Sequence, residues 1–88
     1  MKALDRTTQF KRDVKLMQKR HKNMEKLKDV IEKLLNDEPL PIKMHDHPLL
    51  GNYKGTRECH LEPDWLLIYS LSNDALRLER TGSHSDLF

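Results

Sequence analysis

The sequence predicts an α+β domain in which two N-terminal helices pack on one face of a small antiparallel sheet. Two observations indicate this class: apolar residues recur at helical spacing through the first 36 residues, and from Gly55 onward they follow the alternation of strands. A chain of 88 residues, 36% of them hydrophobic, has material for one domain, residues 1–88, with a modest core. Such a core leaves no room for a deep cavity, so a polymer lying on an open face is the substrate class that fits best.

The two helices are expected at residues 8–21 and from Asn23 to about Asn36. Thr7 or Thr8 can cap the first helix and Asn23 the second, because each side chain can accept a hydrogen bond from a free first-turn N–H. The prolines that follow cannot continue the second helix. The apolar stripes comprise Phe10, Val14 and Met17 in the first helix and Met24, Leu27, Ile31 and Leu34 in the second.

Residues 37–54 contain three prolines and one glycine without a clean period, which indicates an ordered loop. Four apolar residues are expected to pin this loop to the body of the protein: Leu40, Ile42, Leu49 and Leu50.

Three strands are expected in the second half, at Thr56–Leu61, Trp65–Leu71 and Ala75–Thr81. The middle strand is apolar on both faces and should therefore be central in the sheet. Pro63-Asp64 and Ser72-Asn73-Asp74 provide the turns between the strands. Gly82 allows a bend before the C-terminal tail.

Charge is distributed unevenly along the chain. Residues 1–36 hold eleven Lys/Arg and five Asp/Glu (11 − 5 = +6), whereas residues 37–88 hold five and nine (5 − 9 = −4). The basic half suits a phosphate backbone, although a solvated lysine-rich helix surface would show the same composition. The single Cys59 excludes an internal disulfide, and no apolar run approaches the roughly 20 residues of a membrane span. We therefore expect a soluble, cytoplasmic protein with no membrane association.

Histidines in the second half are the most specific candidates for chemistry. His60 ends the first strand, Asp64 lies in the turn that follows, and His84 follows the third strand. In a meander these positions return to one edge of the sheet, so the three side chains should converge. The loop that carries His47 precedes the first strand and can fold over the sheet.

Such a cluster has the parts that RNA cleavage needs. A base takes the proton of the 2′-OH, an acid protonates the leaving 5′-oxygen, and a cation stabilises the charge on the phosphorane. Histidine can be base or acid near neutral pH. Two histidines, one carboxylate and a nearby Lys54, Arg57 or Arg80 would suffice, with no metal and no cofactor.

Each residue also has a simpler interpretation. His60 could be bonded to a backbone carbonyl, Asp64 could only shape its turn, and His84 could belong to a frayed tail. The segment His45-Asp46-His47 could form a metal site together with His60 and Asp64, although no Cys pair supports that site. Strict alternation places Arg80 on the face of Leu76 and Leu78, so it reaches the cluster only if the strand twists or bulges.

The segments DVKLMQKRHKNM, DHPLLGNYKG, ECHLEPDWLLIY and LERTGSH…LF closely resemble the YafQ branch of the RelE/ParE toxin superfamily, over about Phe10 to Phe88. The resemblance implies a RelE-type, microbial ribonuclease-like fold with a short first strand at about residues 2–6. It implies the toxin of a type II toxin–antitoxin system that cleaves mRNA in the ribosomal A site without a metal and so inhibits translation. It also implies a DinJ-type antitoxin as partner, a complex that binds operator DNA, and an association with lysine codons in adenine-rich context.

The resemblance also implies residue roles. His84 would be the general acid and His47 the general base, with His60 and Asp64 orienting groups around the phosphate; the sequence leaves open whether the acid and base are reversed or His60 is the base. Phe88 would stack on an mRNA base, and Arg80 and Lys54 would contact phosphate. Eight cations of the helical half would hold ribosomal RNA: Lys11, Arg12, Lys15, Lys19, Arg20, Lys22, Lys26 and Lys28.

Two other functions remain open at this point. A non-catalytic ParE-like toxin would bind a protein target such as gyrase, which needs no acid/base pair. A metal-dependent nuclease would lose its activity in EDTA.

Overall fold

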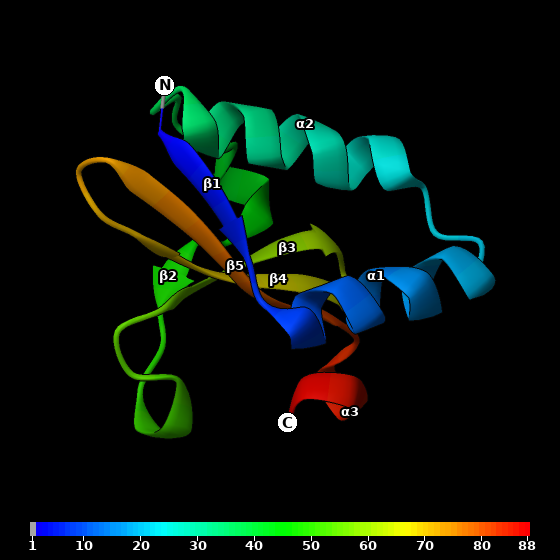
Figure 1. The fold of residues 1–88 in the computed structure, drawn as a ribbon. Coiled ribbons are helices and arrows are strands. Elements are labelled where there is room, and N and C mark those ends of the chain that lie inside the picture. Colours follow the sequence, from blue (N-terminus) through cyan, green and yellow to red (C-terminus); the bar gives the residue numbers. More distant parts are fainter. Residues whose placement is uncertain (1) are drawn as a thin grey trace.

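The computed structural model describes residues 2–88 and confirms the predicted α+β class. A five-stranded sheet has the order β1-β5-β4-β3-β2, and Figure 1 shows it with helices α1 and α2. The predicted meander forms β3 (Arg57–Glu62), β4 (Trp65–Leu71) and β5 (Ala75–Gly82), all paired antiparallel. Within residues 2–88, no helix combines the length and apolarity that a membrane crossing requires.

The outer strands come from segments that local patterns describe poorly. The short first strand that the family resemblance implies is β1 (Ala3–Arg6). It pairs parallel with β5 at one edge, so the sheet is mixed and not wholly antiparallel as predicted. Strand β2 (His47–Pro48) pairs with β3 at the other edge. The segment around His47 is therefore part of the sheet edge, whereas we expected it to fold over the sheet.

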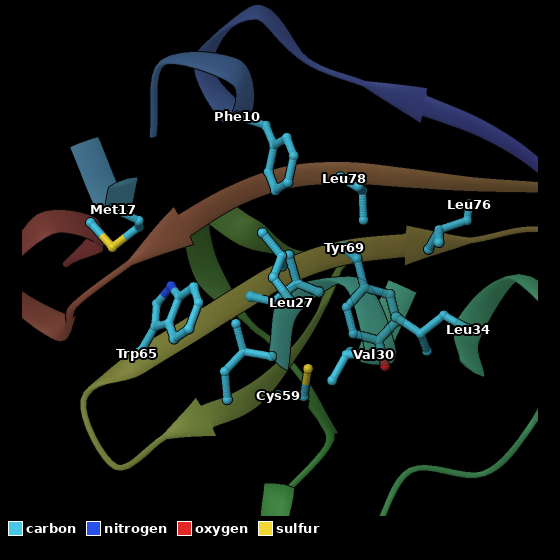
Figure 2. Packing of buried hydrophobic residues seen from close by; sticks show 12 residues of the cluster. Phe10, Met17, Leu27, Val30, Leu34, Cys59, Trp65, Tyr69, Leu76 and Leu78 are labelled. Carbon is cyan, nitrogen blue, oxygen red and sulfur yellow. The ribbon is translucent and has the colours of Figure 1, made fainter. Parts of the chain in front are cut away.

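Both long helices begin and end close to the predicted bounds. Helix α1 (Thr8–Lys19) is capped by Thr7, whose hydroxyl accepts a hydrogen bond from Phe10 N, and α2 (Met24–Leu35) is capped by Asn23. Their apolar stripes cover one face of the sheet, where Trp65 and Tyr69 are fully buried. Figure 2 shows Phe10 and Met17 of α1 and Leu27, Val30 and Leu34 of α2 facing this layer.

The opposite face of the sheet carries a smaller apolar cluster. Leu66 and Ile68 of β4 are buried there under Leu87 of the short C-terminal helix α3 (His84–Leu87), with Leu49 and Tyr53 packed alongside. The expectation for the 37–54 segment is thus correct for Leu40 and Leu49. It is wrong for Ile42 and Leu50, which are 94% and 85% exposed because the short helical turns that contain or adjoin them, Ile42–Met44 and Gly51–Tyr53, point these side chains outward.

Two bulges change which side chains share a face. In β5 the register with β4 shifts so that Arg80 lies opposite Ile68 while Leu78 lies opposite Tyr69, which leaves Glu79 without a partner. In β3 the register shifts between His60 and Glu62. Bulges of this kind redirect side chains at the end of a strand, and both occur where the candidate residues lie.

Candidate active site

The candidate histidines lie on the sheet face opposite to the two long helices. Glu58 and His60 of β3 are paired across from Ile68 and Leu66, which belong to the smaller cluster, whereas Cys59 between them is in the main core. Alternation along β3 therefore sends the carboxylate and the imidazole to the same side. The long helices leave this side uncovered.

His84 and Asp64 form the closest pair of the site. Asp64 Oδ1 accepts hydrogen bonds from the backbone N–H of His84 at 2.9 Å and from its ring Nδ1 at 2.6 Å. The backbone bond and then the ring bond lower the pKa of Asp64 below its usual value, so the carboxylate stays ionised. Because a carboxylate can only accept, Nδ1 of His84 carries the proton, and Nε2 is the atom that can exchange one with a substrate.

His60 lies between this pair and a second carboxylate. Its ring centroid is 5.7 Å from that of His84, in an edge-to-face arrangement. Its Nε2 donates to Oε1 of Glu58 at 2.9 Å, and Glu58 is buried with only 5% of its surface exposed. This bond fixes the orientation of the imidazole and leaves Nδ1 as its other polar atom.

His47 completes the cluster from β2. Its Nδ1 donates to the carbonyl of Pro48 at 3.1 Å, and its Nε2 lies 3.8 Å from Oε1 of Glu58, beyond hydrogen-bond reach. In the neutral ring Nε2 therefore has a free lone pair. This nitrogen faces the same carboxylate to which His60 donates.

The loop before β2 is held by Asp46. Its Oδ1 accepts from the hydroxyl of Tyr69 at 2.6 Å and from Nε of Arg57 at 3.1 Å. Burial, and then the bond to Asp46, raise the pKa of Tyr69, so the phenol remains a donor at all ordinary pH values. This clamp fixes the backbone between His45 and His47.

Helix α3 is anchored to the body of the protein by Asp86. Ser83 and Asp86 form a capping box, and Asp86 also accepts two bonds from Arg20 at the end of α1, at 2.6 and 3.0 Å. The Arg20 guanidinium lowers the pKa of Asp86 far below its usual range. A Cβ at Gly82 would lie 3.0 Å from Asp86 Cβ, so glycine permits this close approach.

The aromatic and cationic candidates occupy different positions. Phe88 is 63% exposed, and its ring contacts Tyr53 edge-to-face at 5.5 Å. Lys54 is exposed beside Tyr53 in the sequence. The bulge in β5 brings Arg80 opposite Ile68, onto the sheet face that carries the histidines. Its Nε and Nη2 donate there to Asp13 of α1 at 2.9 and 3.0 Å. Asp13 thus occupies much of the guanidinium that we expected at the phosphate.

The eight cations of the helical half divide into two groups. Arg20 pairs with Asp86, and Lys22 and Lys26 pair with Glu62 at 3.2 and 2.9 Å. Lys26 and then Lys22 lower the pKa of Glu62. The other five are exposed and have no ion-pair partner among residues 2–88: Lys11, Arg12, Lys15, Lys19 and Lys28.

Glu58 is the residue that sequence reasoning missed. It was named only as part of a strand, although its position two residues before His60 puts both on one face. His47, Glu58 and His60 each offer a ligand atom within 4.8 Å of the others, so together they could hold a metal ion. This group differs from the one considered from sequence, which combined His45, Asp46 and His47 with His60 and Asp64.

Comparisons with known proteins show the family to which this chain belongs. Residues 2–88 match the family model described as a bacterial toxin of type II toxin–antitoxin systems, YafQ. The mRNA interferase toxin YafQ of Escherichia coli K12 is 56% identical over 81 residues, 91% of this chain and 88% of that protein. A crystal structure of YafQ from E. coli BL21(DE3) superimposes with a TM-score of 0.95 at 49% identity, covering 100% of this chain and 99% of that one. YafQ in the E. coli DinJ–YafQ complex gives a TM-score of 0.93 at 50% identity, covering 100% and 99%.

Proposed function

This chain belongs to the YafQ family of type II toxin–antitoxin toxins and is an mRNA interferase, and we propose that it cuts mRNA in the ribosomal A site by attack of the 2′-OH on the adjacent phosphate. The observation that carries the mechanism is the cluster of His47, His60 and His84 around one open edge, with Glu58 and Asp64 bonded to two of the rings. The reaction inhibits translation and requires no metal.

The proton transfers follow from which ring nitrogens are free. Nε2 of His47 takes the proton of the 2′-OH, and Glu58 stabilises the imidazolium that forms. The 2′-oxygen bonds to phosphorus, and the bond to the 5′-oxygen breaks. Nε2 of protonated His84 supplies the proton to that oxygen, while Asp64 holds the ring in place. The products are a 2′,3′-cyclic phosphate and a 5′-OH.

His60 acts between these two groups. Glu58 fixes its ring, and the ring in turn contacts His84. We assign it to orienting the phosphate and balancing the charge of the phosphorane. Lys54 and the remaining amino group of Arg80 would contact neighbouring phosphates.

Phe88 and Tyr53 provide an aromatic pair at the side of the site. Because every base has a stacking face, an exposed ring such as Phe88 can hold an mRNA base beside the cut. The basic helices would bind ribosomal RNA in the A site, which places the reaction in the cytoplasm. A lysine codon in adenine-rich context would be the preferred substrate.

A DinJ-type antitoxin is the protein partner that we propose. A relative 50% identical to this chain is seen in complex with DinJ. The resulting complex would bind operator DNA through the antitoxin.

Mapping cleavage in a purified translation system, with and without ribosomes, tests this function. Replacing His84 by alanine should reduce the cleavage rate by roughly 10²–10⁴-fold, the usual contribution of a general acid, while ribosome binding persists. End-group analysis should find a cyclic or 3′-phosphate. Unchanged cutting by His84→Ala would remove His84 from the mechanism, and toxicity that survives combined loss of His47, His60 and His84 would favour a non-catalytic, ParE-like toxin.

The His47, Glu58 and His60 group favours one competing mechanism, metal-dependent hydrolysis. The same cleavage assay in the presence of EDTA distinguishes the metal-dependent mechanism from the histidine mechanism. Full activity in EDTA supports the histidine mechanism. Loss of activity that a divalent ion restores would support the metal.

A further inference from the structure

We propose that the groove between α2 and residues 41–45 is a subsite for a nucleobase of the RNA, and that His45 contacts that base. The proposal rests on the proposed function, because it extends the same active site. None of the roles assigned above uses His45, and those given to His60 and Lys26 do not involve a ligand in the groove.

The groove has the size and lining of a nucleotide site. Its volume is about 730 Å³, within the roughly 300–1,000 Å³ of pockets that bind small ligands. Pro41 and Met44 line it above the buried Val30 and Leu61, and this apolar floor suits the flat face of a base. It lies between α2 and the end of β3 that follows Arg57 and Glu58, the two residues with which β2 pairs.

The charges that line the groove favour an anionic ligand. Three lysines line the groove, Lys26, Lys33 and Lys43, against Asp29 and Glu62 (3 − 2 = +1). Lys26 is paired with Glu62, whereas Lys33 and Lys43 have no ion-pair partner among residues 2–88. A nucleotide fits these features, because its base can pack on the apolar surface and its phosphate can bind the ammonium groups of Lys33 and Lys43.

The backbone of His45 is held in a fixed conformation. Its backbone is left-handed, with φ of 50°, a conformation that costs free energy for a residue other than glycine and that often marks a functional site. The adjacent Asp46 is clamped by Tyr69 and Arg57, which holds this backbone in place. The His45 ring is exposed and meets the His60 ring edge-to-face at 5.7 Å.

His60 connects the groove to the catalytic cluster, because it lines the groove and its ring also contacts the ring of His84. No residue of α3 lines the groove, although two of its lining residues, Glu62 and Pro63, precede Asp64 in the turn. We assign its occupant to the side of the phosphate away from His84. Because His84 protonates the leaving 5′-oxygen, the nucleotide on the other side carries the attacking 2′-OH. The base of that nucleotide, 5′ of the cut, is therefore the occupant.

A binding experiment that needs no cleavage tests the subsite. A trinucleotide with a 2′-deoxy sugar at the attacking position is titrated into the free protein and followed by NMR. Methyl signals of Val30, Met44 and Leu61 and the ring signals of His45 should shift together. Shifts confined to Phe88 and α3 would overturn the proposal.

A matched pair of variants isolates the His45 ring. His45→Asn keeps a residue that tolerates the left-handed region and should weaken trinucleotide binding about fivefold or more, the effect of losing one base contact. His21→Asn is the control, because His21 is also exposed with a positive φ of 60° but does not line the groove. Equal affinity in both variants would contradict the role of His45.

Cleavage on ribosomes then separates this inference from the proposed function. Wild-type protein should discriminate among bases 5′ of the cut. His45→Asn should reduce that discrimination, whereas His84→Ala should slow cleavage of every substrate. Ribosomal cleavage by a wild-type protein whose groove residues show no NMR shifts with the trinucleotide would overturn the subsite alone. Groove shifts without any ribosomal cleavage by wild type would overturn the function. Discrimination only at the base 3′ of the cut would contradict the assigned polarity.

Discussion

At the scale of single residues, the site depends on carboxylates that orient imidazoles. Glu58 is buried, accepts from His60, and lies 3.8 Å from His47, so one carboxylate serves two rings. Burying a charge is costly unless it is bonded, which means that Glu58 and His60 stabilise each other. The same logic applies more weakly at Asp64 and His84, which are exposed to water.

Replacing Glu58 by glutamine tests this arrangement with little change of volume. The amide keeps a hydrogen-bond acceptor for His60 but cannot stabilise an imidazolium at His47. We expect single-turnover cleavage to slow by roughly 10- to 100-fold with unchanged ribosome affinity, a loss confined to the transition state. An equal loss in ribosome affinity would instead indicate a structural role.

Gly82 matters because of a close approach and not because of its backbone angles. Alanine there would place its Cβ 3.0 Å from Asp86, a residue already held by Arg20 and Ser83. We expect Gly82→Ala to destabilise the fold by about 1–3 kcal/mol, the usual cost of overpacking. Urea unfolding gives the free energy. Wild-type stability together with wild-type cleavage would show that α3 adjusts at no cost.

At the scale of elements, the docking of α3 decides whether His84 is in the site. This helix has only four residues, too few to be stable alone, so its position depends on Leu87 and on the ion pair between Asp86 and Arg20. The pKa of Asp86 is depressed in the folded state, and those of Asp64 and Glu62 are lowered too. Stability from a depressed carboxyl pKa is present above the unfolded value and is lost as the pH falls toward the folded value.

Acid should therefore weaken the protein from about pH 4 downward. Asp86→Asn should lower the free energy of unfolding at pH 7 and flatten its decline between pH 5 and pH 2, as urea titrations at several pH values would show. Asp5→Asn is the control, since Asp5 is exposed and lies 4.0 Å from Arg77. A pH profile of Asp86→Asn parallel to that of the wild type would contradict this account.

At the scale of the whole molecule, the positive charge and the candidate catalytic residues lie on different layers. The helical layer carries the net positive charge, whereas the histidines occupy the opposite face of the sheet. Ion pairs further divide the cations. Lys15 and Lys19 have no ion-pair partner within residues 2–88 and can meet phosphates, while Lys22 and Lys26 are engaged by Glu62.

This division predicts which lysines matter for ribosome binding. Lys15→Gln should weaken binding at low salt and reduce the slope of log affinity against log salt by about one. Lys22→Gln should have a smaller effect, because Glu62 already competes for that ammonium group. Measuring the ribosome affinity of both variants at several salt concentrations tests this prediction. Equal slopes for both variants would mean that the Glu62 pair opens on binding.

The sequence by itself determined the helices, the meander and the convergence of His60, Asp64 and His84. Capping, apolar period and hairpin topology are local properties, and they place the ends of successive strands together whatever else the chain does. The family motifs added a short first strand, which no local pattern indicates, and the structure alone shows that it pairs parallel with β5. They also assigned roles to His47 and Phe88.

Only the tertiary structure decided the rest. The bulge at Glu79 placed Arg80, a predicted phosphate ligand, on the face of the histidines, and Asp13, 67 residues away, engages its guanidinium. The clamp of Tyr69 on Asp46, the exposure of Ile42 and Leu50, and the participation of Glu58 likewise follow from docking. The physical reason is that burial and ion pairing depend on the distance between elements after packing, which residue spacing along the chain does not specify.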